Sequence, residues 1–169
     1  MLPLAILALP PSTKAFSDVT IGDTLYAPTT YLEQIKVFKG YEDGSFGKDR
    51  IINRAESLKT ILTAAEHEVP EQIASKFTDV PADVWFGPFV NYAADLEIVS
   101  GDADTGQFAP ARTVNKAEFL KMLLKAFEID PANFTLEASA ADVPQDAWFA
   151  PYLQFAVQFN VITLSLIHI

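Results

Sequence analysis

The sequence predicts a mainly α-helical fold built from tandem helix–loop–helix units, the third of them incomplete. Three observations lead to this prediction. An Asp-Val pair recurs at a spacing of 61 to 63 residues, beginning at Asp18, Asp79 and Asp142. Each pair is followed by apolar residues at the i, i+3, i+4, i+7 spacing of a short amphipathic helix. In the first two copies a glycine-rich loop then leads into a second helical stripe. Units of this kind cannot bury an apolar face alone, so we expect the copies to pack on one another.

The beginning of each copy carries two shared blocks. The opening blocks are Phe16-Ser17-Asp18-Val19, Phe77-Thr78-Asp79-Val80 and Ala141-Asp142-Val143. An aromatic residue, a small residue and a proline follow, as Tyr26-Ala27-Pro28, Phe86-Gly87-Pro88 and Phe149-Ala150-Pro151. Trp85 and Trp148 precede this triplet in copies two and three, and Leu25 stands there in copy one. We expect the aspartates to cap or brace a turn. We expect the tryptophans, and the phenylalanine of each later loop, to lie in the core.

The first helix of each copy is predicted from its apolar stripe. Proline lies near the first turn, where its missing N–H costs nothing. The stripes are Pro28, Tyr31, Leu32 and Ile35; Phe89, Tyr92, Ala93 and Leu96; and Tyr152, Phe155, Ala156 and Phe159.

A glycine-rich loop and a second helix complete the first two copies. The loops run from Gly40 to Phe46 and from Gly101 to Phe108, and their glycines suit a helix C-terminus and a tight turn. Asn53-Arg54-Ala55-Glu56 and Asn115-Lys116-Ala117-Glu118 then predict a capping box at each second helix. The predicted copies span residues 16–69, 77–134 and 139–163.

Composition excludes several classes of protein. Half of the residues are apolar, which argues against disorder. The net charge is −10 with only 12 Lys and Arg, so the chain lacks the basic face that nucleic-acid binding needs. The absence of cysteine excludes disulfides, thiolate metal sites and a cysteine nucleophile.

The two ends of the sequence read differently from the copies. Residues 1–15 begin with a nine-residue apolar run, too short to span a bilayer, which we interpret as the remnant of a secretory signal peptide rather than a segment packed on the fold. Residues 164–169, Leu-Ser-Leu-Ile-His-Ile, are what one frame of a transposon-based sequencing adapter encodes. We therefore expect the natural sequence to continue differently after Thr163, with an attached cargo domain beyond it; a genuine apolar C-terminus is the alternative.

These blocks, taken in order, resemble the S-layer homology (SLH) repeat of bacterial cell-surface proteins over about residues 16–163. The family pattern is Phe-x-Asp-Val, aromatic-x-Pro, Gly-Tyr-x-Asp-Gly-x-Phe and Thr-Arg-Ala-Glu. The resemblance implies a pseudo-threefold helical bundle. It also implies non-covalent anchoring at the cell envelope, through binding of a cell-wall-linked polysaccharide that is often a pyruvylated secondary polymer. The protein would then be secreted and would not span the membrane.

The resemblance also implies which residues bind the glycan. The family uses the arginine of the helix-start motif on the anionic sugar, a role that falls to Arg54 and, as a departure, to Lys116. A basic residue beside unpaired helix N–H groups would favour an anion there. Lysine cannot grip a carboxylate bidentately, so we expect a weaker site at Lys116. The loop residues predicted to share the role are Gly40, Tyr41, Asp43, Gly44, Gly101 and Asp102, while Glu56 and Glu118 are predicted to cap.

Three other functions compete with anchoring. His67 has no evident triad partner, so no enzyme activity and no cofactor are expected. Asp102 and Asp104 resemble the start of an EF-hand, but the glycine comes one position early and Thr113 replaces the twelfth-position Glu. We interpret that loop as a turn, with a weak calcium site as the alternative, and expect no metal. A surface protein-interaction module without a glycan ligand is the alternative function.

Overall fold

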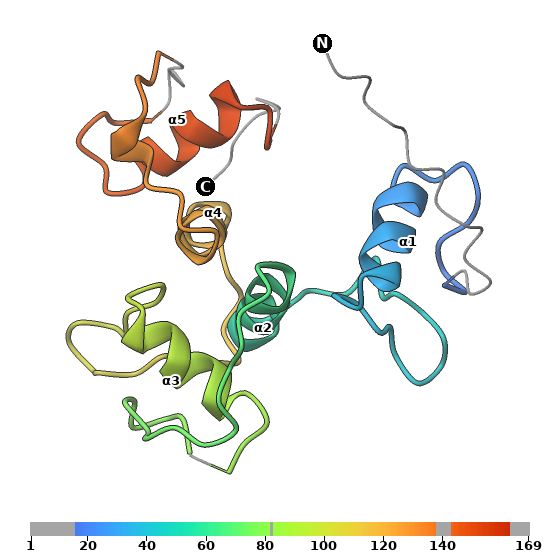
Figure 1. Ribbon diagram of the computed structural model, residues 1–169, viewed down its shortest axis with the longest axis horizontal. Helices are drawn as coiled ribbons and strands as arrows, with labels where there is room; N and C mark the ends of the chain where they lie inside the picture. Colours follow the sequence, from blue (N-terminus) through green and yellow to red (C-terminus); the bar gives the residue numbers. More distant parts are fainter. Residues whose placement is uncertain (1–15, 82, 138–142, 163–169) are drawn as a thin grey trace. The chain divides into compact units, whose positions relative to one another are not determined.

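The computed structural model describes residues 16–81, 83–137 and 143–162 (Figure 1). The predicted signal-peptide remnant, the C-terminal hexapeptide and Asp142 lie outside these residues. The described chain contains five α-helices and one short 3-10 helix and no β-strand, which confirms the mainly α prediction. Within these ranges no helix is both long and apolar enough to cross a bilayer. The chain divides into two compact units, residues 1–50 and 51–169, described separately below.

The N-terminal unit is held together by the carboxylate of Asp18. Its helix α1 (Tyr26–Gln34) follows the opening block, whose Phe16 and Val19 are buried. Asp18 accepts hydrogen bonds from the backbone N–H groups of Phe46 (2.6 Å), Gly47 (2.8 Å) and Lys48 (3.0 Å). This confirms that the opening aspartate braces a turn, because it ties the start of the copy to the end of its glycine-rich loop.

The C-terminal unit contains α2 (Arg54–Ala64), α3 (Gly87–Asp95), α4 (Lys116–Ala126), η1 (Pro131–Asn133) and α5 (Ala150–Gln158). Helix α2 packs on α3 and α4, and α4 packs on α5. The second helix of one copy thus packs on the first helix of the next. The pseudo-threefold bundle stays a prediction.

The core of this unit lies between α2, α3 and α4. Leu58 and Leu62 of α2 meet Val90 of α3 and Met122 of α4, all at most 2 % exposed. Each aliphatic side chain buried in this way contributes about 1.5–3 kcal/mol to stability. A smaller cluster of Leu120, Leu153 and Ala156 joins α4 to α5.

Both predicted capping boxes are present. The side chain of Asn53 accepts from Glu56 N–H at 2.9 Å, and the Glu56 carboxylate accepts from Asn53 N–H at 2.9 Å. Asn115 and Glu118 repeat the arrangement at 2.9 and 3.2 Å.

The helix C-termini differ from the prediction. We expected the loop glycines to suit the helix ends, but α1 and α3 end several residues earlier. The left-handed residues there are Lys36 (φ 63°) and Glu97 (φ 56°). Gly40 serves a different purpose: a Cβ there would lie 2.5 Å from the Phe16 ring, so glycine allows the loop to press on the opening block.

The expectation that the tryptophans lie in the core is wrong. Trp85 and Trp148 are 52 % and 54 % exposed, because they precede the helices instead of lying on their inward faces. Helix α1 begins at Tyr26 and α3 at Gly87, so Thr24, and not Leu25, is equivalent to Trp85. Phe108, by contrast, is 2 % exposed, as predicted for a core residue.

Candidate ligand-binding groove

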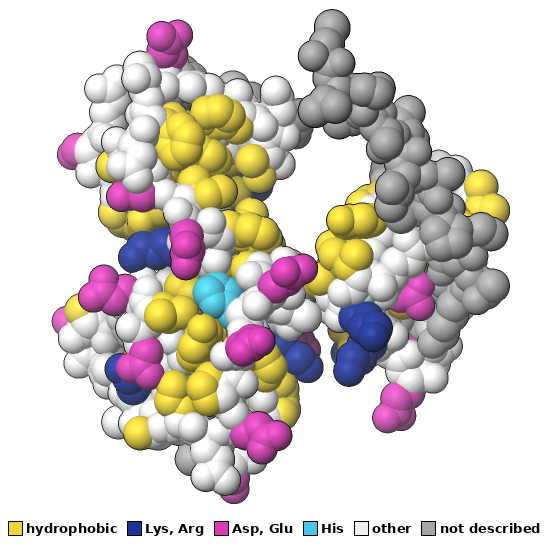
Figure 2. Space-filling model, in the orientation of Figure 1, with side chains coloured by type: hydrophobic (Ala, Val, Ile, Leu, Met, Phe, Trp, Pro, Cys, Tyr) yellow, Lys and Arg dark blue, Asp and Glu magenta, His cyan; other side chains and the backbone are white. Residues whose placement is uncertain are grey.

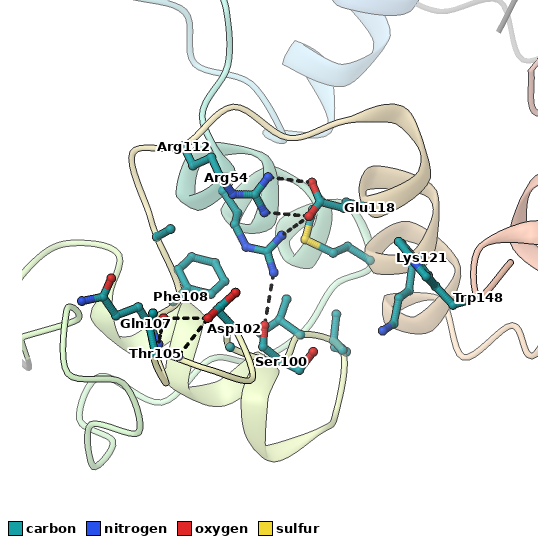
Figure 3. Close-up of a pocket in the computed structure, with 15 residues that line it drawn as sticks. Arg54, Ser100, Asp102, Thr105, Gln107, Phe108, Arg112, Glu118, Lys121 and Trp148 are labelled. Carbon is teal, nitrogen blue, oxygen red and sulfur yellow. Dashed lines mark hydrogen bonds and ion pairs between the residues drawn. The ribbon is translucent and has the colours of Figure 1, made fainter. Parts of the chain in front are cut away.

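A groove of about 510 Å³ lies in the C-terminal unit where the start of α2 faces the second glycine-rich loop (Figure 3). Three sequence copies contribute to it: Arg54 from copy one, the loop and α4 from copy two, and Trp148 from copy three. Its polar and charged lining comprises Arg54, Ser100, Asp102, Thr105, Gln107, Arg112, Glu118 and Lys121, and its apolar lining includes Phe108, Met122 and Trp148.

The chain segment before α4 places Arg54 in this groove. Arg54 N–H donates to the carbonyl of Arg112 (2.8 Å), and Ala55 N–H donates to the carbonyl of Pro110 (3.1 Å). Asn53 and Thr113 form an isolated antiparallel bridge beside them. The expectation of unpaired N–H groups at this helix start is therefore wrong. The N–H groups of Arg54 and Ala55 are not free to bind an anion.

Arg54 is a buried cation whose hydrogen bonds are incomplete. It is 8 % exposed, and its guanidinium lies 4.8 Å from the centre of the Phe108 ring. Nη1 is 3.4 Å from Glu118 Oε1 and Nη2 is 3.3 Å from the Ser100 carbonyl, while the buried Nε has no partner in the described chain. Burial lowers the pKa of Arg54, against the opposing effect of Glu118. The hydrogen bonds of the Arg54 guanidinium therefore only partly replace those that it would make with water.

Arg112, which sequence inspection did not single out, grips Glu118 with two bonds. Its Nη2 lies 2.6 Å from Oε1 and its Nη1 lies 3.0 Å from Oε2. Burial acts to raise the pKa of Glu118, but hydrogen bonds from Arg112 and Asn115 outweigh it and lower the pKa. The same bond to Glu118 raises the pKa of Arg112. The available signal was that arginine stands three residues before each capping asparagine, as Arg50 and Arg112.

The second loop forms one wall of the groove, and Asp102 shapes it. Asp102 Oδ1 accepts hydrogen bonds from the N–H of Asp104 (3.1 Å) and from the N–H and hydroxyl of Thr105 (both 2.9 Å). These bonds to Thr105 and Asp104 lower the pKa of Asp102, although burial acts the other way. The loop is a turn, as we interpreted it. Among the described residues no group of three His or acidic side chains is placed to hold a metal.

Lys121 and Trp148 form the far side of the groove. The Lys121 ammonium lies 5.3 Å from the Trp148 ring, and Lys59 lies 5.2 Å from Trp85 in an equivalent pair. Burial, with Lys125 and Arg54 nearby, lowers the pKa of Lys121. The groove lining contains three basic side chains and two acidic ones. The basic residues are Arg54, Arg112 and Lys121, and the acidic residues are Asp102 and Glu118. The groove is thus locally positive in a strongly acidic protein. Figure 2 shows acidic side chains spread over the visible face and basic ones in small groups.

The other predicted site residues are not in this groove. The structure brings Arg54, Gly101 and Asp102 together, whereas Lys116 is exposed at the start of α4 outside the lining. Gly40, Tyr41, Asp43 and Gly44 belong to the loop of the N-terminal unit. There Asp43 Oδ1 accepts from the N–H and hydroxyl of Ser45, at 2.9 and 2.7 Å.

His67 joins helices in the C-terminal unit. Its Nδ1 lies 3.3 Å from the Tyr92 hydroxyl and its Nε2 lies 2.8 Å from the Ala126 carbonyl. Both ring nitrogens thus connect the end of α2 to α3 and α4.

Residues 76–120 match the family model of the S-layer homology domain. The matched segment runs from the opening block of copy two through the groove loop into α4. The chain is similar to the surface layer protein of Brevibacillus choshinensis, with 33 % identity over 133 residues. This chain contains an S-layer homology domain.

Two further SLH relatives agree with that assignment. The middle cell wall protein of Brevibacillus brevis is 35 % identical over 104 residues, which is 60 % of this chain and 10 % of the relative. The Surface-layer 125 kDa protein of Lysinibacillus sphaericus is 30 % identical over 126 residues, 75 % of this chain and 10 % of the relative. The Brevibacillus choshinensis match covers 77 % of this chain and 12 % of the relative, so the chain spans only about a tenth of these proteins. Family and relatives indicate a secreted protein of the cell surface or envelope.

Proposed function

We propose that this chain holds a surface protein to the bacterial envelope by binding an acidic, cell-wall-linked polysaccharide in the groove at Arg54. Cell-surface anchoring in general is supported by the SLH domain and by the surface-layer proteins to which the chain is similar. The charge and shape of the groove support an acidic polysaccharide as the ligand.

The incomplete hydrogen bonding of Arg54 carries the proposal. A carboxylate on a sugar, such as a pyruvyl ketal, would give the Nη groups of Arg54 a better acceptor than their present contacts at 3.3 and 3.4 Å. Arginine suits this role because its planar fork matches a carboxylate. Trp148 offers an exposed aromatic face on which an apolar sugar face can pack. The volume of about 510 Å³ falls in the ~300–1,000 Å³ range of small-ligand sites.

We propose that the described chain acts as an attached module without catalysis of its own. Two relatives are enzymes by name, an exoglucanase of Acetivibrio thermocellus and a cell wall amidase of Bacillus anthracis. The chain matches only 8 % of the first and 21 % of the second. This supports a shared anchoring part joined to different cargo, with the catalytic residues of the enzymes elsewhere.

Co-sedimentation with purified bacterial cell walls tests the ligand. Arg54→Met removes the charge and keeps an apolar stem against Phe108, so we expect binding to walls to fall about tenfold or more. Lys125→Ala is the matched control, because Lys125 lies on α4 outside the groove and carries the same charge. Walls stripped of their secondary polymer should bind neither the wild type nor the Lys125→Ala control. Binding that survives both Arg54→Met and stripping would contradict the glycan proposal and favour a protein partner.

A further inference from the structure

Glu118 is positioned to compete with any acidic ligand of Arg54. It is the carboxylate nearest to the Arg54 guanidinium, at 3.4 Å. If Glu118 paired fully with Arg54, it would supply the same kind of acceptor that a sugar carboxylate would supply. The groove would then already contain its own anion. What keeps Glu118 from doing so therefore decides whether Arg54 is available.

Arg112 is the group that holds Glu118. It takes both carboxylate oxygens, at 2.6 and 3.0 Å, whereas Arg54 has one contact at 3.4 Å. Bidentate pairs of this kind are the stronger ones, because both N–H bonds align with the carboxylate. Glu118 Oε2 also accepts from Asn115 N–H at 3.2 Å, which fixes the carboxylate at the start of α4.

Arg112 is itself fixed by its backbone, although 45 % of its side chain is exposed. Its N–H donates to the Ala109 carbonyl (3.1 Å) and its carbonyl accepts from Arg54 N–H (2.8 Å). Its Nη1 also donates to the Thr113 carbonyl at 3.1 Å. The segment before α4 therefore positions both Arg54 and Arg112, and Arg112 competes with Arg54 for the Glu118 carboxylate (Figure 3).

Capping alone does not require this pairing. Glu56 completes the same capping box in copy one, and in the described ranges it forms no ion pair with a basic side chain. The Arg112–Glu118 pair is thus not needed to complete a capping box.

We propose that Arg112 is a positioning residue for the groove: it sequesters the Glu118 carboxylate, so that the Arg54 guanidinium stays available to an acidic ligand. This inference rests on the proposed function. It adds that the affinity of the site is set by competition between two carboxylates, one built in and one brought by the ligand. Arg112 acts through Glu118 and does not need to touch the glycan.

Arg112→Lys in the full chain tests the idea. Lysine keeps the charge but cannot hold a carboxylate bidentately, so Glu118 is released toward Arg54. We expect the apparent Kd for intact, polymer-bearing cell walls to rise about fivefold to tenfold, the size of one typical net hydrogen bond. Adding Glu118→Gln should return binding to within about twofold of the wild type, because glutamine still completes a capping box but carries no charge. Thermal unfolding of each variant checks that the fold is retained.

The outcomes separate the competing explanations. Weakening by Arg112→Lys that Glu118→Gln reverses supports the positioning role. Unchanged binding of Arg112→Lys would overturn it, and so would weakening that Glu118→Gln fails to reverse, since Arg112 would then contact the glycan directly. In both of those cases wild-type binding and its loss in Arg54→Met leave the proposed function intact. If the wild type itself ignores the wall polymer, the proposed function fails and this inference fails with it.

Discussion

The guanidinium of Arg54 lies 4.8 Å from the centre of the Phe108 ring. Its buried Nε is unpaired among the described residues, and its two hydrogen bonds are 3.3 and 3.4 Å long. A buried ion in this state adds little to stability, because the water it has lost is not replaced by good partners. Binding sites commonly trade stability for a group that is free to meet a ligand. Arg54 fits that pattern at the scale of a single residue.

The first prediction concerns the stability of Arg54→Met. We expect the free energy of unfolding to stay within about 1 kcal/mol of the wild type, or to increase, because methionine keeps the packing and removes the poorly paired charge. Urea unfolding followed by circular dichroism measures it. A loss of more than about 2 kcal/mol would mean that Arg54 is a structural ion after all.

A second prediction concerns pH. Hydrogen bonds from Arg112 and Asn115 hold the pKa of folded Glu118 below its ordinary value of 4.5. The stabilisation from the charged carboxylate is therefore complete above about pH 4.5 and is lost as the pH falls through the lower folded pKa. We expect the stability difference between wild type and Glu118→Gln to be constant near neutral pH and to shrink on acidification. A difference that does not change with pH would contradict the lowered pKa.

At the scale of elements, each of the first two copies has an aspartate that closes a loop distant in the sequence. Asp79 accepts from the N–H groups of Phe108 (2.9 Å) and Ala109 (2.7 Å), repeating what Asp18 does in copy one. The two ends of a copy are thereby joined before its second helix begins. In copy two this joins the opening block to the wall of the groove.

The third prediction tests that role. Asp79→Ala leaves two part-buried N–H groups without their acceptor, so we expect a loss of about 1–3 kcal/mol in unfolding free energy. Asp79→Asn keeps one acceptor oxygen and should lose less. Asp104→Ala is the control, because Asp104 is an exposed acidic residue of the loop that Asp79 closes. It should unfold like the wild type. Equal effects of Asp79→Ala and Asp104→Ala would show that only net charge matters.

The elements themselves were largely predictable from the sequence. Helix period, proline position and the Asn-x-x-Glu pattern locate all five helices, because each signal is local in the chain. The exception is copy one, where the sequence pattern matches Leu25 with Trp85 although Thr24 is the equivalent residue. The mismatch arises because Pro28 lies one position later in α1 than Pro88 does in α3.

The groove was only partly predictable. Arg54, Gly101 and Asp102 carry family motifs, but Arg112, Lys121 and Trp148 become neighbours through packing between copies. Trp148 looked like a core residue because exposure of an aromatic depends on what covers it, which one sequence does not reveal. The N–H groups expected to be free at α2 instead donate to the carbonyls of Pro110 and Arg112, which lie 55 and 58 residues away in the sequence.

At the scale of the whole molecule, the two compact units have very different cores. In residues 16–50 the buried apolar side chains are Phe16 and Val19, whereas the core clusters lie in the C-terminal unit. Stability therefore should not be uniform along the chain. The boundary falls beside Ile51, which is 81 % exposed.

The fourth prediction follows from that difference. We expect backbone amides of α1 to exchange with solvent faster than those of α2, α3 and α4, because fewer buried contacts must be broken to open α1. Limited trypsin digestion should cut first after Lys48 or Arg50, both exposed, and leave a resistant C-terminal fragment. Uniform exchange across all helices, or first cleavage inside α2 or α4, would argue against two units of unequal stability.

The hydrogen bonds from Arg54 and Ala55 to the carbonyls of Arg112 and Pro110 have a consequence for inheritance and for synthesis on the ribosome. No single copy encodes the groove. Copy one supplies Arg54, copy two supplies the loop wall and Arg112, and copy three supplies Trp148. A nascent chain cannot form the site until Trp148 has emerged. A recombination event that exchanged one copy would exchange parts of sites rather than a whole one, so the order of copies is inherited together with the specificity.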